Sequence, residues 1–583
     1  MCGIAGFNWK NPGLIRVMME RLRHRGPDDE GVFEGERASM AHTRLSVIDL
    51  SAGGHQPMTF GPHTIAYNGE IYNFKELRRE LEEKQHHFVS DSDTEVLLHA
   101  YAQWGEGCLS KFNGMFAFAI YDRKKNEWFL ARDRLGIKPL YYCRTQEAFI
   151  FASELSALTA ACEDIDFDAV NAYFTFRFTP GDQTLFKGVK RLPPGHFMRF
   201  DGREAEMKCY WAACCESNGK RIEDNADKLI DLLTQSLKRR LVSDVPLGIF
   251  LSGGLDSSFL VGLTAKLSGK PPDVFHARFS MDPNDESARA KLVADRYGAK
   301  FHQIDVDVDA VGILPEVTRH LGEPIGDAAT IPTYLMSKET KKFVTVILSG
   351  EGADELFAGY PKYKILSLAR NFPSLPRIFR DGLCGRVSGL MEANPWRKYL
   401  NLVSVFSGEE KKKLFRFDFN EPPAAPAAFP GDLSLANLLM FDIRTWLPND
   451  LLHKIDSMTM AHALEARVPF LDHELVEFAL TIPPDQKLRL WREKVILRFA
   501  AQGILPDKIL QRKKQGFTLP AGLWMKRGLS AYAFALIEEC GVDFLDKKYM
   551  RFIIAEGGKN IFSRRKFWTL LFFMEWHRQK ING

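Results

Sequence analysis

The chain has 583 residues, which predicts two to four domains because a domain usually contains about 100–200 residues. With 45% hydrophobic and 26% charged residues it has the composition of a folded globular protein, and a disordered or collagen-like chain is excluded. The formal net charge is only +4, so no basic surface for nucleic acid or an anionic membrane is expected.

The first 210 or so residues alternate short strand patterns with a few helical ones. Buried strands are predicted at 116–121 and 127–131, and the polar turn between them is typical of a β-hairpin. Apolar residues at 141–142 and 149–151 continue the strand pattern. Successive hairpins with interspersed helices indicate antiparallel sheets covered by helices, in an α+β domain that spans 1–211.

Two helices of this region have predicted N-terminal caps. Asn73 is expected to cap a helix that carries Phe74 and Leu77 on one face. Ser92 and Glu95 have the spacing of a capping box, in which each side chain bonds the backbone of the other residue.

From about residue 225 the pattern changes to alternating strands and helices. Apolar strands are predicted at 245–251, 274–279, 301–306 and 343–348. Helical stretches separate them, which predicts a parallel, doubly wound α/β sheet in a second domain that spans 225–583. The Pro- and Ala-rich run 421–430 predicts a loop or linker, and the remainder is mostly helical in pattern.

Nothing in the sequence predicts export or a membrane span. No apolar run reaches the roughly 18–20 residues needed to cross a bilayer, and the segment 567–576 contains Glu575 and is expected to be a core helix. The first seven residues lack the basic region of a secretory signal. The nine cysteines include no CxxC pair, so neither a zinc ribbon nor a disulfide framework is predicted, and a cytoplasmic location is expected.

Cys2 is a candidate nucleophile because it follows the initiator methionine directly. Removal of that methionine would leave Cys2 with a free α-amino group, whose pKa lies near 7.7–8.0. Such a group can act as the general base for the thiol of its own residue. The alternative to a catalytic role is that a cysteine occupies the second position by chance.

Downstream residues supply the groups that glutamine binding requires. Glutamine carries a carboxylate, an ammonium group and a carboxamide, so a glutaminase needs a cation, anions and donors for an oxyanion. Arg44 is a cation, Glu70 and Asp93 are anions, and Asn68-Gly69 ends a predicted strand. Each residue also has a simpler explanation when taken alone. Arg44 could belong to a surface ion pair, Asp93 could be the neighbour of a helix cap, and Asn68-Gly69 could form a turn.

A second candidate site begins with Leu-Ser-Gly-Gly-Leu-Asp-Ser-Ser at 251–258, between a predicted strand and a helix. Two glycines permit close approach to an anion, and the serine hydroxyls and first helical N–H groups can bind it. No lysine follows the glycines, so this is not a P-loop. A glycine turn with capping serines is the alternative.

Three acidic residues follow another predicted strand, within Ser-Gly-Glu-Gly-Ala-Asp-Glu at 349–355. Ligands of open α/β sheets bind at the carboxyl ends of the strands, where this segment lies. Asp354, together with Asp256 of the first loop, would supply the hard oxygen ligands that Mg²⁺ prefers.

Several ordered motifs resemble known families. Met-Cys-Gly-Ile-Ala-Gly at 1–6, Arg-Gly-Pro-Asp at 25–28 and Tyr-Asn-Gly-Glu-Ile-Tyr-Asn at 67–73 are similar to class II glutamine amidotransferases, which are N-terminal nucleophile hydrolases. The loop 251–258 resembles the SGGxDS loop of ATP pyrophosphatases. With the segments 456–461 and 465–472, the chain as far as about Pro520 resembles glutamine-hydrolysing asparagine synthetases.

The resemblance implies roles in a glutaminase site. Cys2 would attack the carboxamide, Arg44 would hold the carboxylate of glutamine, and Glu70 and Asp93 would hold its ammonium group. The oxyanion hole would be formed by the Asn68 side chain and the Gly69 N–H, and the rest of the pocket by Leu45, Ser46, Val47 and Ile48.

The resemblance also implies a site for ATP and Mg²⁺. The pyrophosphate loop would comprise Ser252, Gly253, Gly254, Asp256, Ser257 and Ser258, and the adenosine would lie against Leu251, Arg278, Ser349 and Gly350. Arg278 departs from the family, which usually has an aliphatic residue there. Glu351 would assist formation of an acyl-adenylate, and Lys494 would neutralise charge near the α-phosphate unless it is a solvated helix charge.

The implied protein is a two-domain ligase that binds glutamine, aspartate and ATP, with a homodimer as one candidate form. Glutamine hydrolysis would supply ammonia, which would attack a β-aspartyl-adenylate to give asparagine, AMP and pyrophosphate. Because free ammonia is mostly protonated at pH 7, a protected path lined by apolar segments at the domain junction is expected. An amidotransferase for another carboxylic acid and a catalytically silent binding protein are the alternatives, and a nucleic-acid partner is not expected.

Overall fold

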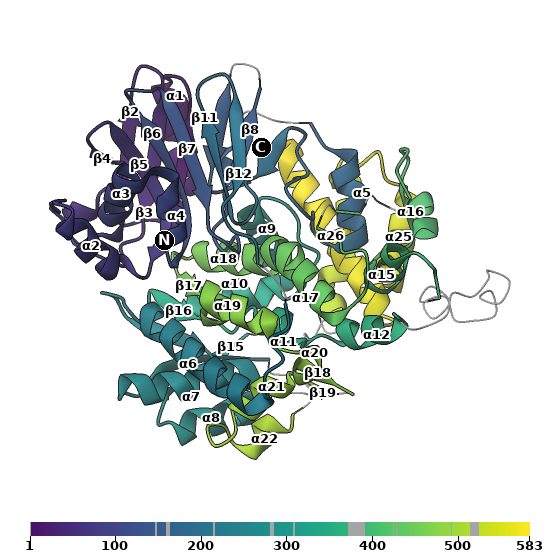
Figure 1. The fold of residues 1–583 in the computed structure, drawn as a ribbon. Helices are drawn as coiled ribbons and strands as arrows, with labels where there is room; N and C mark the ends of the chain where they lie inside the picture. The colour runs from purple at the N-terminus through teal and green to yellow at the C-terminus, as the bar shows by residue number, and fades with distance from the viewer. Residues whose placement is uncertain are drawn as a thin grey trace.

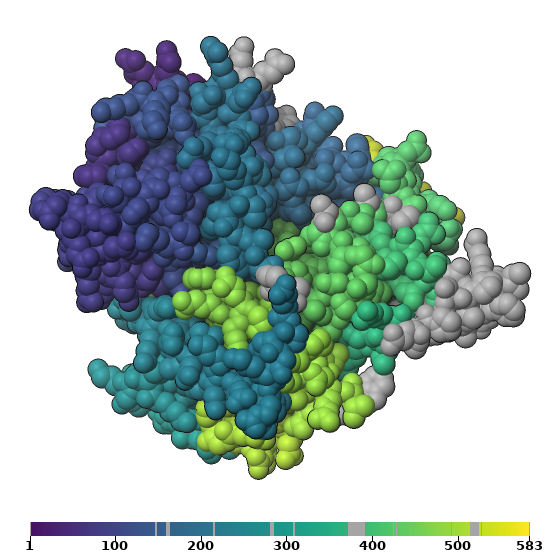
Figure 2. Space-filling view, in the orientation of Figure 1, coloured from purple at the N-terminus to yellow at the C-terminus, as the bar shows by residue number. Residues whose placement is uncertain are grey.

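The structure is a computed structural model that describes residues 2–145, 148–158, 164–213, 216–279, 285–306, 309–370, 391–421, 423, 425–426, 428–490, 492–512 and 524–582. The strands of the N-terminal part, purple to blue in Figure 1, lie above a separate sheet formed by later residues. Figure 2 shows the two parts packed directly against each other, with helix α19 (His473–Thr481) beside the N-terminal part.

Two six-stranded sheets form the N-terminal part. The first has the order β10-β8-β9-β1-β3-β2 and contains β1 (Gly3–Phe7), β2 (Asp29–Glu34), β3 (Ser39–Arg44), β8 (Tyr141–Arg144), β9 (Phe149–Ala152) and β10 (Val189–Arg191). The second has the order β12-β11-β7-β6-β5-β4 and contains β4 (Met58–Phe60), β5 (His63–Ile71), β6 (Gly114–Asp122), β7 (Glu127–Arg132), β11 (His196–Phe200) and β12 (Ala205–Cys209). The predicted hairpin is confirmed as β6 and β7, in which Asp122 pairs with Glu127.

The two sheets pack face to face. Ile4 and Phe151 of the first sheet share one buried cluster with Ala117, Trp128 and Leu130 of the second. Alternate residues along each strand therefore enter a common apolar layer. The antiparallel sandwich expected from the sequence is confirmed.

Helices cover the outer faces of this sandwich. Leu81 of α2 (Phe74–Glu83) and Val96 of α3 (Asp93–Trp104) pack against Phe116 of the second sheet. The buried face of α1 (Pro12–Leu22) packs with β1 of the first sheet.

Both predicted helix caps are wrong in detail. The Asn73 side chain makes no cap bond to α2, because its Oδ1 accepts from the Asn113 N–H at 2.9 Å. The Ser92 hydroxyl caps α3 by accepting from the Thr94 N–H at 3.1 Å. Glu95 does not complete a capping box, because its carboxylate accepts from the Ser90 N–H at 2.8 Å and fixes the preceding turn.

A five-stranded parallel sheet forms the centre of the second part, with the order β15-β14-β13-β16-β17. Its strands are β13 (Leu247–Phe250), β14 (Asp273–Arg278), β15 (Lys300–Asp305), β16 (Val346–Leu348) and β17 (Glu465–Arg467). Ile249 of β13 lies opposite Val274 on one side and Leu348 on the other. β16 begins three residues later than predicted, because the turn after α10 (Thr330–Thr340) continues and leaves Phe343 exposed.

Helices lie on both sides of this sheet, as expected for a doubly wound fold. α7 (Leu255–Ser268) and α8 (Ser287–Arg296) contact β13 and β14, and Figure 1 shows them below the sheet with α6 (Ile222–Arg240). α10 and α18 (Leu452–Met460) contact β14 and β17 and lie above it.

Further helices of the second part are α9 (Ala310–Leu321), α11 (Ala353–Phe357), α12 (Pro361–Ala369), α15 (Pro395–Val403), α16 (Gly408–Leu414), α17 (Leu435–Arg444), α20 (Pro484–Lys487), α21 (Val495–Ala500), α22 (Asp507–Leu510), α24 (Ser530–Glu539), α25 (Lys547–Glu556) and α26 (Ile561–Asn582). In α26 the segment from Phe567 to Trp576 is buried, so the expected core helix is confirmed. Within the described residues, no helix is both long and apolar enough to cross a membrane. The run 421–430 lies partly outside the described residues.

Candidate active sites

A pocket of about 310 Å³ opens beside Cys2, at the end of the sandwich where β1, β3 and β5 meet. It is lined by Cys2, Arg44, Leu45, Val47, Ile48, Gln56, Tyr67, Gly69, Glu70, Ser92, Asp93 and Thr94. The fold thus brings together cation, carboxylates and thiol from four separate stretches of chain.

Asn68 and Gly69 provide the features of an oxyanion site. The Asn68 Oδ1 accepts from the Cys2 backbone nitrogen at 3.0 Å, which fixes the amide orientation. Its Nδ2 is buried and has no hydrogen-bond partner among the described residues. A side chain at Gly69 would collide with the Met115 carbonyl, so only glycine lets this strand lie so close to its neighbour.

Arg44 is buried and is held by backbone rather than by a surface ion pair. Its Nη1 donates to the Ser51 carbonyl at 2.9 Å, and its Nη2 donates to the carbonyls of Ile48 and Asp49. The loop that follows β3 therefore curls around the guanidinium and fixes its position. Ser46, predicted with this pocket, donates its backbone N–H to Asp28 at 2.8 Å and is not part of the lining.

Two buried carboxylates face the same pocket. Asp93 accepts from the Tyr67 hydroxyl at 2.8 Å and from the Ile71 N–H at 2.9 Å, yet burial raises its pKa to about 6. Burial and the charges of Glu465 and Asp93 hold the pKa of Glu70 well above its usual range. An ammonium group of a ligand beside these two carboxylates would favour their ionised forms.

The Cys2 thiol is buried, and burial raises its pKa. The Arg44 guanidinium acts in the opposite direction. A buried thiol of raised pKa needs a base beside it to become a nucleophile.

The loop 251–258 is shaped by its own serines. The Ser257 hydroxyl accepts from the Ser252 N–H at 3.2 Å, and the Ser252 hydroxyl accepts from the Gly254 N–H at 3.2 Å. Gly253 has φ = 71°, and an added Cβ would approach the Ala290 nitrogen to 2.8 Å. The loop leads into α7 with Ser258 buried, so the first turn of that helix faces the loop.

Lys494 lies between two carboxylates at the carboxyl edge of the sheet. Its Nζ is 2.6 Å from Asp256 Oδ2 and 2.7 Å from Asp354 Oδ1. The residue is 2% exposed and precedes α21 with φ = 53°, so it is not a solvated helix charge. Strands β13 and β16, far apart in sequence, bring these carboxylates together.

Two carboxylates at this edge have the oxygen chemistry that magnesium prefers, although no group of three or more potential metal ligands occurs among the described residues. The second carboxylate oxygen of Asp256, Oδ1, is buried and accepts no hydrogen bond within the described part of the chain. Asp354 lies across the same lysine, so two hard oxygen ligands converge next to the glycine loop.

The remaining predicted nucleotide residues lie around the same edge. Leu251 and Ser349 are buried, and Gly350 packs so closely that a Cβ would lie 3.3 Å from Asp256 Cβ. Arg278 ends β14 with its guanidinium 3.1 Å from Asp305 of β15, and both side chains are exposed.

Acidic residues crowd the segment after β16. Burial and the charges of Asp354 and Glu351 raise the pKa of Glu355 to about 8. A segment that gathers so much negative charge is suited to bind cationic groups or a metal–nucleotide complex.

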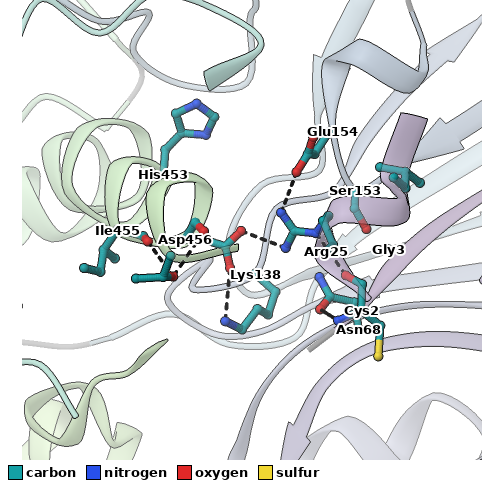
Figure 3. Close-up of polar contacts among 12 residues, drawn as sticks. Cys2, Gly3, Arg25, Asn68, Lys138, Ser153, Glu154, His453, Ile455 and Asp456 are labelled. Atoms are coloured by element: carbon teal, nitrogen blue, oxygen red, sulfur yellow. Dashed lines mark hydrogen bonds and ion pairs between the residues drawn. The ribbon is translucent and has the colours of Figure 1, made fainter. Parts of the chain in front are cut away.

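Charged residues link the two sites at the junction shown in Figure 3. Arg25 donates to the Cys2 carbonyl at 3.0 Å, to Glu154 at 2.7 Å and to Asp456 of α18 at 2.8 Å. Lys138 donates to the other Asp456 oxygen at 3.1 Å. These ion pairs lie at the junction between the two parts, next to Cys2.

A cavity of about 190 Å³ lies beside these ion pairs. Its wall combines Pro139, Tyr141, Ser153, Glu154 and Leu155 from the first part with His320, Leu321, His453 and Ser457 from the second. Burial lowers the pKa of His320 and of His453 to about 4, so both imidazoles are neutral at pH 7.

Sequence reasoning missed several residues of these sites. Tyr67, Gln56 and Thr94 line the pocket, and Arg512 holds the glycine loop by donating to the Gly253 carbonyl at 3.0 Å. Arg25 begins the Arg-Gly-Pro-Asp motif at 25–28, but the sequence did not predict its ion-pair partner, because Asp456 lies more than 400 positions away.

Two family models match the chain. Residues 1–211 match the glutamine amidotransferase domain, and residues 228–578 match asparagine synthase. Asparagine synthetase [glutamine-hydrolyzing] 1 of Bacillus subtilis (strain 168) is 36% identical over 99% of this chain and 96% of its own length. The chain belongs to the asparagine synthase family.

Other members of the family and a more distant protein give the range of similarity. Asparagine synthetase [glutamine-hydrolyzing] 3 of the same organism is 35% identical over 89% of this chain and 87% of its own length. Amidase chry2 of Gibberella zeae is 27% identical over 94% of this chain and 93% of its own length. A solved structure, the allosteric regulatory enzyme of purine biosynthesis, covers 52% of this chain and 80% of its own at 17% identity and a TM-score of 0.30, too low to carry an argument.

Proposed function

We propose that this chain is a glutamine-hydrolysing asparagine synthetase that converts aspartate, glutamine and ATP to asparagine, glutamate, AMP and pyrophosphate. The observation that carries the proposal is the pairing of two sites in one body. The Cys2 pocket has a cation, carboxylates and an orphan amide donor, and Lys494 lies between two carboxylates beside the glycine loop. The near full-length similarity to glutamine-hydrolysing asparagine synthetases supports it.

The proposed domain boundaries are 1–211 for the glutaminase and 225–583 for the synthetase. The last strand of the first part, β12, ends at Cys209, and α6 begins at Ile222. The family matches, 1–211 and 228–578, support the same division.

In the proposed glutaminase reaction, the free α-amine of Cys2 removes the thiol proton and Sγ attacks the glutamine carboxamide. The oxyanion is stabilised by Asn68 Nδ2, whose Oδ1 the Cys2 nitrogen orients, and by the Gly69 N–H. The protonated amine then gives its proton to the departing ammonia, and water hydrolyses the thioester to glutamate.

In the proposed synthetase reaction, the glycine loop binds the β- and γ-phosphates of ATP while aspartate attacks the α-phosphate. Asp256 and Asp354 would hold Mg²⁺, which supplies charge neutralisation to the departing pyrophosphate when bound. The Lys494 ammonium, now fixed by both carboxylates, stabilises negative charge near the α-phosphate. Glu351, on the same segment, organises the acyl-adenylate.

The cavity at the junction is the proposed passage for ammonia. Its wall carries residues of both parts, and its imidazoles are neutral at pH 7 and cannot give a proton readily to ammonia. Glu154 of this wall joins Arg25, which contacts the Cys2 backbone. We also propose a cytoplasmic location and, as the partner, a second copy of the chain in a homodimer.

The acceptor acid is tested by mass spectrometry of the products formed from ATP, Mg²⁺, glutamine and a panel of carboxylic acids. Asparagine is expected with aspartate, together with AMP and pyrophosphate in equal amounts. Amidation of another acid with none of aspartate would favour an amidotransferase of specialised metabolism, in line with the more distant amidase relative.

Arg44→Ala and Asp93→Ala are each expected to weaken glutamine use about 10–100-fold. Each removes a partner of one end of the glutamine zwitterion, and a charge-assisted hydrogen bond is worth roughly 1.5–3 kcal/mol. The measurement is kcat/KM for glutamate release, beside synthesis from ammonium chloride. Asp91→Ala is the matched control, because Asp91 lies two residues away and is exposed. Equal damage to both activities would assign Arg44 and Asp93 a folding role.

A further inference from the structure

A residue of the synthetase sheet lies against Glu70, which lines the glutaminase pocket. Arg467 ends the edge strand β17, and its Nη2 lies 3.7 Å from Glu70 Oε2 in the Cys2 pocket. Both residues are buried, although 397 positions separate them along the chain. The contact therefore crosses the junction between the two parts.

The guanidinium of Arg467 is fixed by three other contacts. Its Nε donates to Glu465 at 2.6 Å, and its Nη1 donates to the carbonyls of Arg240 and Val242 at 2.7 and 2.6 Å. Its Nη2 makes no hydrogen bond to the described residues and faces Glu70. The guanidinium is thus held in place with one buried nitrogen toward a pocket carboxylate.

The charges around Glu70 explain why such a cation is needed. Glu465 and Arg467 face Glu70 from β17, Asp93 faces it from α3, Cys2 lies just before β1, and Tyr67 and Tyr72 belong to its own segment. Burial, Glu465 and Asp93 raise the pKa of Glu70, whereas Arg467 lowers it. Among these neighbours Arg467 is the guanidinium that favours the ionised carboxylate.

We infer that Arg467 is a positioning residue of the glutaminase, supplied by the synthetase part, which orients Glu70 and favours its ionised form for the ammonium group of glutamine. The inference rests on the proposed role of Glu70. The backbone carbonyl of Arg467 accepts the Ser349 N–H at 2.9 Å, so Arg467 lies in the strand beside the proposed nucleotide segment. A glutamine site on this chain is complete only with the synthetase part in place.

The test is the steady-state kinetics of the full-length Arg467→Met variant. We expect KM for glutamine to rise about 10-fold or more, since one charge-assisted contact is lost. The kcat at saturating glutamine and synthesis from ammonium chloride should stay within about twofold, because Cys2 and the backbone contact to Ser349 remain. An unchanged KM, or an equal loss of both activities, would overturn the inference.

The pH profile gives a readout that a merely structural role would not move. In Arg467→Met the pKa of Glu70 should rise, so the acidic limb of kcat/KM for glutamine should move to higher pH. Glu465→Gln removes a negative charge that raises the pKa of Glu70, so the same acidic limb should move to lower pH. Loosened packing cannot produce opposite shifts in the two variants, and shifts of one sign would overturn the inference.

Two further variants keep the outcomes distinct. If Arg467→Met does not fold because Glu465 loses its guanidinium partner, Glu465→Gln/Arg467→Met removes both buried charges and should still show the raised KM. In a Glu70→Gln background, Arg467→Met should raise KM no further, because the two residues act on one contact. An unchanged KM in Glu70→Gln alone would refute the role of Glu70, whereas additive effects would refute only that of Arg467.

Discussion

Cys2→Ala is expected to abolish synthesis with glutamine while leaving synthesis with ammonium chloride within about twofold of the unchanged enzyme. The thiol serves only the glutaminase half-reaction in the proposed mechanism, and loss of a nucleophile costs about 1000-fold or more. Cys2 lies in a pocket that contains no residue of the nucleotide segment. The measurement is asparagine formed with each nitrogen source on one preparation.

Cys108→Ala is the control for this variant. Cys108 is also a buried thiol of the first part, but it lies in the apolar cluster beneath α3 and not in the pocket. Both activities should survive in it. Glutamine-dependent synthesis by Cys2→Ala at the original rate would refute the assignment of the nucleophile.

Asp256→Asn and Glu351→Gln are expected to lose aspartate-dependent pyrophosphate release about 100-fold or more, with either nitrogen source. The Oδ1 atom of Asp256 has no hydrogen-bond partner among the described residues and is the proposed Mg²⁺ ligand, and its Oδ2 lies 2.6 Å from the Lys494 ammonium. Replacing the carboxylate by an amide removes the negative charge that both contacts use. Glu351 belongs to the same segment as Asp354. Glutamate release should persist, because the Cys2 pocket is built from other residues.

The assay is pyrophosphate and glutamate measured in parallel, with Asp295→Asn as the control. Asp295 is an exposed aspartate of α8 that pairs with Lys291 on the surface, and its loss should change neither product. Release of pyrophosphate at the original rate by both test variants would contradict the adenylation mechanism. Loss of both products together would indicate that the substitutions unfold the chain.

Local patterns predicted the elements of this fold well and their ends less well. The hairpin β6–β7 and the apolar strands β13 and β14 follow from periodicity and turn composition, which act between near neighbours. The cap at Asn73 failed because Asn113 binds that side chain. The capping box at Ser92 is incomplete because Glu95 turns back to Ser90, although the Ser92 hydroxyl does cap its helix. A cap depends on which donor is nearest in space, and spacing along the chain does not contain that information.

The sequence by itself determined the two candidate sites, because their residues stand in compact motifs at the ends of strands. Cys2, the Asn68-Gly69 pair and the loop 251–258 were all identified without coordinates. Only the tertiary structure decided how the sites meet. Arg25 with Asp456 and Arg467 with Glu70 each join positions about 400 residues apart, and ion pairs of that kind depend on the docking of two folded parts. Burial then sets the pKa of each group in the junction, and burial is a property of the packed chain and not of any segment.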